Sequence, residues 1–422
     1  MSAEQRTGAP VGSTVVLVEP NPDGHRLFYV RLLVERLVAL GHRPVLLTSP
    51  QALTAPEFQV HLQRAVADGL DVATGDCWRR PTPAVRGHYL AQAEALAGAG
   101  GRVVVPDGDL WLASCIRHRV GQRFSVTGAQ LRVLLMRPPV AGLRPSSTAG
   151  IRAGIKTALI VAAMAAGVRA QALRSAGAPA QLPRLVSGMP QVVDPVDMPF
   201  RATDRPRLRE RLGLPAGRRV AVIAGSLTAR KGVGVVLDAW TLLAAGPAGT
   251  VGSGGTGGPA GTGGPADPPT LLLVGRADEA VQRQLDSAVG ADLRERGLLL
   301  VRNEYVTDDE LNTYIASANC VILAYENEAP SGILGKAAVA GVPVLAAGSA
   351  QVRAETIRLA VGLGVPSTPE HIAAGVTDLL HGPETVAADP ALQDADPSTF
   401  ADRLCGLGAS TEAGPDGHVV RQ

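Results

Sequence analysis

The sequence predicts an α/β protein made of two Rossmann-like domains, each with a parallel sheet. Short apolar segments rich in valine and leucine alternate with helical patterns along both halves of the chain. A length of 422 residues is also enough for two domains of ordinary size. Strands separated by helices form right-handed crossovers, so neighbouring strands should run parallel.

The first Rossmann-like domain is expected at residues 1–195. Its strands are expected at 14–19, 44–49, 102–109 and 131–139. The helix between the first two strands places Leu33 and Leu37 on one face and ends at Gly41. Helical segments between the later strands continue the same alternation.

The second Rossmann-like domain is expected at residues 196–385, after a joint near 192–200. Its strands are expected at 219–226, 271–278, 298–306 and 320–325. The segment 244–269 is so rich in Gly, Pro and Thr that it is expected to be a disordered insertion. Residues 386–422 are expected to form a C-terminal segment with a short helix at 397–408 and a loose tail.

The composition argues against several classes of protein. The net charge is +2 and aromatic residues make up only 3%, so neither a basic field nor a base-stacking platform for nucleic acid is expected. The four cysteines are far apart and form no CxxC pair, which fits a reduced cytoplasm. The N-terminus has no signal-peptide pattern. The apolar run 155–168 is shorter than the ~20 residues that span a bilayer, so it is expected to pack in a core, and integral membrane association is not expected.

Lysine is rare in this chain. Of the 40 basic residues, only Lys156, Lys231 and Lys336 are lysines. Lys231 lies in GSLTARKG, which follows a strand and opens a helix. A diphosphate at that edge of the sheet would meet the helix N-terminal amides and an ammonium group. A solvated Arg-Lys pair on a surface loop is the plainer interpretation.

A second candidate phosphate site is the helix start SGIL, where Ser331 and Gly332 offer backbone amides. A plain N-cap is the alternative role for Ser331, and the two roles are compatible.

Several sequence motifs, in a fixed order, resemble those of the GT-B-fold glycosyltransferases, in particular the large retaining group that uses nucleotide-sugar donors. The order is RERLGLP, GSLTARKG, LLLVGRAD, YVTDDELNTYIASANCVILAY and APSGILGKAAVAGVPVLAAG, between about residues 204 and 380. The first half is similar but weaker, with LVALGHRPVLLTS as its main match. The resemblance implies two Rossmann-like domains facing a cleft, a cytoplasmic glycosyltransferase and a nucleotide-diphosphate sugar as the donor, with no cofactor.

The resemblance also implies which residues bind the donor: Gly225, Ser226, Arg230, Lys231, Tyr305, Ser331, Gly332, Ile333, Leu334 and Lys336. Glu328 matches the first of the two glutamates in the family's acidic motif and is assigned to catalysis. The chain departs from the family at two places. Ser226 stands where the family usually has an arginine, a loss for which Arg230 could compensate. Lys336 stands where the second glutamate would hold the donor ribose, and lysine cannot accept those hydrogen bonds.

Lys336 is therefore expected to pair with phosphate, or with a carboxylate such as Glu326 or Glu328, or else to extend into solvent. Tyr305, in a loop after a late strand, is expected either to stack near the base or to lie in the core.

The acceptor side is expected in the first domain. His25 follows the first strand and, with Asp107 or Asp109 from a later strand end, is a candidate catalytic dyad. In a retaining enzyme the leaving phosphate can take the acceptor proton, so no strong protein base is required. Asp107 and Asp109 are also the nearest candidates for a metal site, but no metal is expected.

Arginines at N-domain strand ends could meet an acidic acceptor, although a solvated surface is the more common role: Arg79, Arg80, Arg137 and Arg144. A small soluble acceptor, a natural product or a sugar, is favoured over a membrane-bound one.

Two other functions compete with glycosyl transfer. Because Ser226 and Lys336 depart from the family's pattern, the chain could instead be a nucleotide-sugar-binding or auxiliary protein that keeps the fold but has lost glycosyl transfer. A nicotinamide-dependent dehydrogenase is disfavoured because no GxGxxG follows the first strand.

Overall fold

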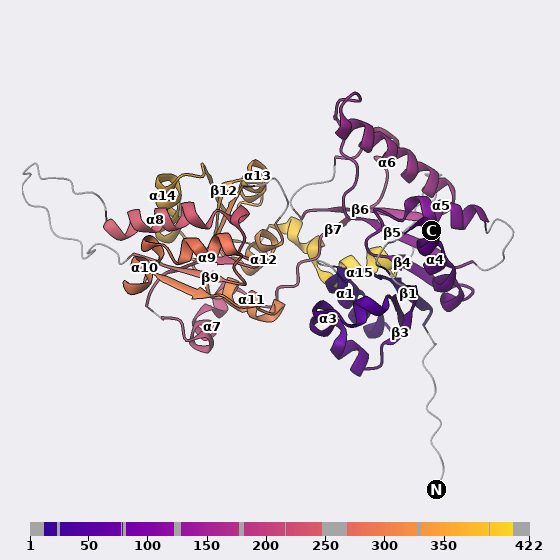
Figure 1. The fold of residues 1–422 in the computed structure, drawn as a ribbon, viewed down its shortest axis with the longest axis horizontal. Helices are drawn as coiled ribbons and strands as arrows, with labels where there is room; N and C mark the ends of the chain where they lie inside the picture. Colours follow the sequence, from indigo (N-terminus) through magenta and orange to yellow (C-terminus); the bar gives the residue numbers. More distant parts are fainter. Residues whose placement is uncertain are drawn as a thin grey trace, which may run out of the picture. The chain divides into compact units, whose positions relative to one another are not determined.

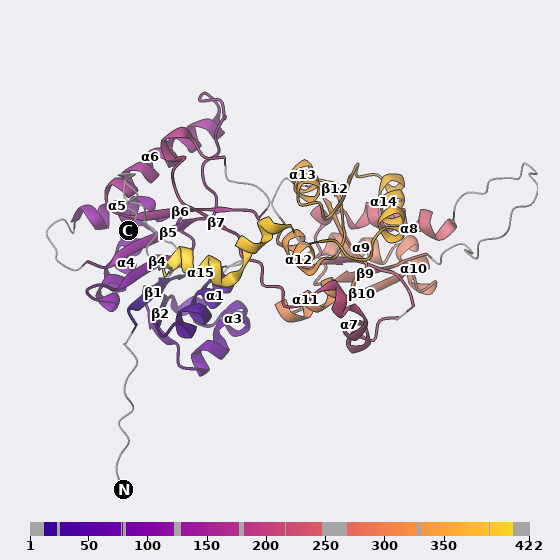
Figure 2. The same ribbon diagram turned by 180° about the vertical axis from the view of Figure 1, so that it is seen from behind.

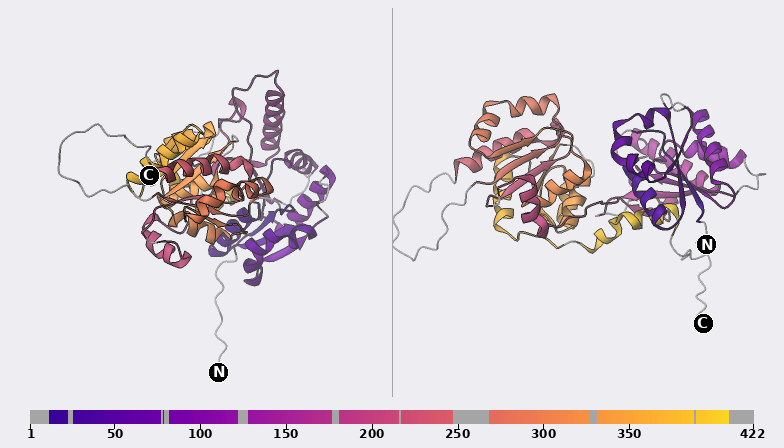
Figure 3. Two further views of the ribbon diagram at one scale, coloured as in Figure 1. Left: turned by 60° about the vertical axis from the view of Figure 1, so that its left-hand side comes forward. Right: turned by 90° about the horizontal axis from the view of Figure 1, so that it is seen from below.

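The computed structural model describes residues 12–22, 26–76, 78, 82–121, 128–176, 181–215, 217–246, 268–326, 331–387 and 389–407. The chain divides into two compact units. The first unit comprises residues 1–195 and 394–422, and the second comprises residues 196–393. Each unit has one parallel sheet with helices on both of its faces (Figures 1 and 3).

The first unit has the strand order β3-β2-β1-β4-β5-β6-β7. Its strands are β1 Thr14–Val18, β2 Arg43–Thr48, β3 Asp71–Thr74, β4 Arg102–Val105, β5 Gln130–Leu135, β6 Arg169–Arg174 and β7 Gln191–Val193. Its helices are α1 Arg26–Ala39, α2 Pro50–Leu53, α3 Pro56–Ala67, α4 Pro83–Ala97, α5 Leu112–Gly121, α6 Thr148–Ala165, η1 Arg184–Val186 and α15 Pro397–Cys405, with η4 Pro390–Ala395 at the boundary between the units.

The second unit has the strand order β10-β9-β8-β11-β12-β13. Its strands are β8 Val220–Ala224, β9 Thr270–Val274, β10 Leu299–Arg302, β11 Cys320–Tyr325, β12 Val344–Gly348 and β13 Gly362–Val365. Its helices are η2 Ala202–Asp204, α7 Arg205–Leu212, η3 Ala229–Lys231, α8 Val233–Ala245, α9 Glu279–Leu285, α10 Ala288–Glu295, α11 Asp308–Ser317, α12 Gly332–Ala340, α13 Ala350–Arg358 and α14 Pro369–His381.

The apolar strands are buried on both faces, as expected for parallel sheets covered by helices. In β1, Val16 and Val18 belong to one hydrophobic cluster, whereas Val15 and Leu17 belong to the cluster on the opposite face. All five residues of β8 are likewise buried. The prediction of an α/β fold with Rossmann-like sheets is therefore confirmed.

The C-terminal helix α15 completes the first unit rather than ending in a separate segment. Phe400 stacks on Tyr29 of α1 with ring centroids 5.3 Å apart, and Arg36 of α1 forms an ion pair of 2.6 Å with Asp402. Figures 1 and 2 show α15, in yellow, among the indigo and purple elements of the first unit.

Helix α6 packs one side against the core of the first unit, through Ile160 and Ala163, so the core position expected for the apolar run 155–168 holds for that side of the helix alone. Within α6 only Thr157, Ile160 and Ala163 are buried, and the helix lies along the outside of the first unit (Figure 1). Only 17% of its 18 residues are buried, although the helix is apolar enough for a core or a membrane. Hydropathy alone does not tell whether an apolar helix has a covering partner.

Candidate functional site

Each sheet has a point where the strand order reverses, between β1 and β4 in the first unit and between β8 and β11 in the second. Ligands of open α/β sheets bind outside the carboxyl ends of the strands at such points. The two edges are described separately below.

Lys231 lies at the reversal point of the second unit. Its side chain leaves the short helix η3, is only 5% exposed, and donates a hydrogen bond from Nζ to the carbonyl oxygen of Ala224 at the end of β8. Nζ also lies 5.9 Å from the ring centroid of Tyr325, the last residue of β11. The ammonium group is thus placed between the ends of the two strands that flank the reversal point.

Two glycines allow the loop after β8 to enclose this lysine. Gly225 has φ +87°, and a Cβ atom there would lie 3.0 Å from Lys231 Nζ. Gly232 has φ +61°, and a Cβ atom there would lie 2.3 Å from the carbonyl oxygen of Ala324. The loop is also tied to the end of β11, because the Glu326 N–H donates to the Arg230 carbonyl oxygen at 2.9 Å. Only glycine fits both positions.

Replacing Gly232 with alanine is expected to destabilise the second unit by roughly 3 kcal/mol or more, because it adds a steric conflict to an unfavourable φ. Gly213 is a matched control, since its φ of +64° and ψ of +27° resemble those of Gly232 but a Cβ atom there meets nothing within 4 Å. Gly213→Ala should cost about 1 kcal/mol. Chemical denaturation of both variants measures the difference, and equal losses would contradict the close approach of the loop to β11.

Helix α12 begins at the same edge. Its N-cap Ser331 accepts a hydrogen bond from the Leu334 N–H at 3.3 Å, and its hydroxyl lies 3.1 Å from the Tyr325 hydroxyl. Gly332 is exposed, and a Cβ atom there would meet open space. Ile333 points back towards the loop after β8, since its Cδ1 would lie 3.9 Å from a Cβ atom on Gly225. The helix N-terminus and the Lys231 loop therefore share one edge.

The electrostatics at Lys231 favour a bound anion. Burial, together with the positive charge of Arg230, lowers the pKa of the ammonium to about 8. A charged group held away from water is stabilised when an anion replaces its lost hydration. Arg230 is itself exposed and donates from Nε to Thr228 Oγ1 at 3.3 Å, whereas Ser226 is exposed in the same loop.

The described residues give Lys336 two partners that were not expected. Its Nζ donates to the Asp197 carbonyl oxygen at 2.9 Å and to Asn312 Oδ1 at 2.6 Å. Asn312 in turn donates to the same Asp197 oxygen at 3.0 Å. Lys336 thus fastens α12 to α11 and to the first residues of the second unit, and these contacts differ from the predicted pairing with Glu326.

Tyr305 lies beyond the end of β10 and is 65% exposed, so the core alternative for this residue is wrong. Two of the predicted catalytic residues, His25 and Glu328, lie outside the described residues.

The reversal point of the first unit has a buried carboxyl group that the sequence analysis did not select. Glu19 follows β1, is 3% exposed, and accepts a hydrogen bond from the Asn21 N–H at 3.0 Å. Burial, together with the negative charge of Asp107, raises the pKa of Glu19 to about 8. The sequence did contain a signal for this residue: in TVVLVE, an apolar strand ends directly in a glutamate. Carboxyl groups with raised pKa values are common at active sites.

The two aspartates after β4 are both paired with cations. Asp107 forms an ion pair with Arg26 Nε at 2.6 Å. Asp109 pairs with Lys156 Nζ at 2.8 Å and also accepts from the Arg137 N–H at 3.0 Å. Among the described residues, no group of three His, Cys, Asp or Glu side chains is placed to hold a metal ion.

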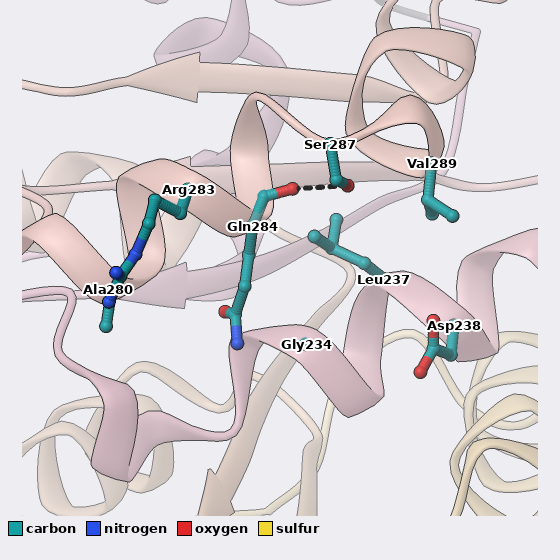
Figure 4. A pocket seen from close by; sticks show the side chains of 8 residues that line it. All are labelled: Gly234, Leu237, Asp238, Ala280, Arg283, Gln284, Ser287 and Val289. Atoms are coloured by element: carbon teal, nitrogen blue, oxygen red, sulfur yellow. Dashed lines mark hydrogen bonds between the residues drawn. The ribbon is translucent and has the colours of Figure 1, made fainter.

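A shallow pocket of about 520 Å³ lies elsewhere in the second unit, between α8, α9 and α10 (Figure 4). Gln284 and Arg283 line it from α9, and Leu237 and Asp238 line it from α8. None of the lining residues belongs to the loop after β8 or to the start of α12. The chemistry at Lys231 makes the sheet edge the stronger candidate site.

The fold is similar to that of several solved glycosyltransferases. A glycosyltransferase from Rickettsia africae superimposes with a TM-score of 0.60 at 12% identity, covering 94% of this chain and 97% of that one. Sucrose-phosphate synthase from Thermosynechococcus elongatus gives 0.56 at 16% identity, with 94% and 96% covered. HepE from Anabaena, solved with UDP-glucose, gives 0.53 at 15% identity, with 93% and 98% covered.

No protein-family model matches the sequence, and no curated protein matches it. The structural likenesses extend over nearly the whole chain, and they show that it has the GT-B fold with two Rossmann-like units.

Proposed function

We propose that the protein is a cytoplasmic glycosyltransferase that moves a sugar from a nucleoside-diphosphate sugar to a hydroxyl-bearing acceptor. The observation that supports this most directly is the buried ammonium of Lys231 at the reversal point of the second sheet, beside the N-terminus of α12. A diphosphate is the natural ligand for an ammonium group next to free helix amides. HepE, which shares the fold, was solved with UDP-glucose.

In this proposal Lys231 and the amides after Ser331 hold the diphosphate and stabilise the charge that develops on it as the bond to the sugar breaks. The acceptor oxygen forms the new bond to the sugar carbon, and its proton passes to the leaving phosphate. Because the acceptor must lie on the same face of the sugar as the leaving phosphate to give it this proton, the sugar would keep its anomeric configuration. Glu328 and His25, with Asp107, are the further catalytic residues of the proposal.

The acceptor is proposed to be a small natural product or sugar bound by the first unit. At the reversal point of the first sheet, the neutral Glu19, the positive Arg26 and the negative Asp107 provide groups that can recognise hydroxyls.

A thermal-shift panel of UDP-, GDP-, ADP- and dTDP-sugars tests the donor. A ligand at 100 times its dissociation constant should add about 2.7 kcal/mol of stability. The stabilising nucleotide sugar is then incubated with a pool of hydroxyl-bearing acceptors, and release of nucleoside diphosphate is measured. Release that depends on the acceptor supports transfer. Stabilisation without release would favour a binding or auxiliary protein, and no stabilisation by any nucleotide sugar would refute both.

A further inference from the structure

The outer side of α6 is an apolar surface that no element in the described parts of the chain covers. Ile151 is 52% exposed and Ile155 is 59% exposed, and both lie on the same side of the helix. Leu185, in η1 beside α6, is 80% exposed. The apolar residues around this side, called the α6 surface below, are Val140, Leu143, Ile151, Ile155, Val161 and Leu185. Apolar side chains exposed on neighbouring elements in this way often mark an interaction site.

The segment of the chain that carries the α6 surface has basic residues but no acidic ones. Residues 110–193 contain eleven arginines and lysines and no aspartate or glutamate. Arg144, Arg152 and Arg184 are exposed in or next to the α6 surface, and none of them forms an ion pair with a carboxylate in the described parts of the chain. An apolar helix face with basic residues at its sides is typical of helices that lie in the interface of an anionic bilayer.

The helix is attached to the first unit along its inner side, so it lies on a surface rather than crossing a membrane. Thr157, Ile160 and Ala163 are buried, and Lys156 pairs with Asp109 near the middle of the helix. An 18-residue helix is about 27 Å long, which gives an extended flat contact. For the helix to span a bilayer, the packing of its inner side and the Lys156–Asp109 ion pair would both have to be broken.

We propose that the α6 surface docks the protein onto an anionic lipid bilayer, with Ile151 and Ile155 inserted among the lipids and the nearby arginines against the headgroup phosphates. The proposal does not depend on glycosyl transfer.

Co-sedimentation with lipid vesicles tests the proposal. Vesicles of phosphatidylcholine alone are compared with vesicles that also contain phosphatidylglycerol. Binding is expected only with the anionic lipid, and added salt should weaken it. The double variant Ile151→Ser/Ile155→Ser should bind at least about tenfold more weakly. Each of Arg144→Gln and Arg152→Gln should reduce binding about fivefold.

Ile357 offers a matched control, because it is 61% exposed on α13 in the second unit. Ile357→Ser should bind vesicles like the wild type. No binding to anionic vesicles, or an equal loss in Ile357→Ser, would overturn the proposal. So would a dimer in sedimentation velocity that the Ile151/Ile155 variant dissociates while vesicles stay unbound, since the surface would then bind a second copy. Thermal unfolding of the Ile151/Ile155 variant, measured without lipid by the fluorescence of Trp78 and Trp111 in a Trp240→Phe background, shows whether the first unit is intact.

Discussion

Replacing Lys231 with methionine is expected to weaken nucleoside-diphosphate binding on the order of a hundredfold, because a charge-assisted hydrogen bond to phosphate is lost. Methionine keeps an unbranched apolar side chain in the buried site. The protein should remain folded, since burial makes the charged ammonium of Lys231 costly, as its lowered pKa shows. Isothermal titration calorimetry with the nucleotide identified by the thermal-shift panel measures the effect.

Lys336→Met is the matched control, because Lys336 lies in α12 but donates to Asp197 and Asn312. This variant should lose about 1–3 kcal/mol of stability, since it leaves the Asn312 amide oxygen without a donor. Its affinity for the nucleotide should stay within a few-fold of the wild type. Undiminished affinity in Lys231→Met, or an equal loss in both variants, would contradict a phosphate site at Lys231.

Glu19→Gln is expected to remove a pH dependence of stability from the first unit. The folded-state pKa of Glu19 is about 8, above the ordinary value of 4.5, so the folded protein holds this proton more tightly than the unfolded chain. The wild type should therefore lose stability as the pH rises from about 4.5 to 8, by up to about 1.4 kcal/mol per pH unit. Glutamine resembles the protonated acid and does not titrate, so above pH 8 the variant should be the more stable protein.

Urea unfolding at acidic, neutral and alkaline pH measures this difference. Trp78 and Trp111 lie in the first unit, whereas Trp240 lies in the second. Both proteins are therefore prepared with Trp240→Phe, so that tryptophan fluorescence reports the first unit. Parallel pH profiles of the two proteins would show that Glu19 is charged at neutral pH and would remove it from the proposed acceptor edge.

The central strands could be predicted from the sequence because burial on both faces leaves an uninterrupted apolar run. VAVIA in β8 and CVILAY in β11 are examples. The strands β3, β6, β7 and β13 were not predicted. They are short or partly polar, with sequences DVAT, RAQALR, QVV and GLGV, and all except β6 lie at the edges of their sheets. Half-exposed edge strands have no such run.

The loop around Lys231 was predictable because its glycines and its lysine are neighbours in sequence. The partners of Lys336 were not, because Asp197 lies 139 residues away along the chain. The environment of Glu19 likewise depends on residues that the fold brings to it, including the ion pair between Arg26 of α1 and Asp107 after β4. Residues whose role depends on distant contacts are those for which the sequence alone gave the wrong partner or none.

The return of the chain to the first unit has a consequence for the order in which the protein matures during synthesis. Phe400, Ala401, Leu404 and Cys405 belong to the same hydrophobic cluster as the strand β1 and the helix α1. The ribosome makes the N-terminal part of that cluster first and these four residues last, after the whole second unit. The second unit can therefore finish folding while the first still lacks part of its core. A nascent chain released before residue 397 would leave the α1 face of the first unit uncovered, and it would be a substrate for chaperones and proteases.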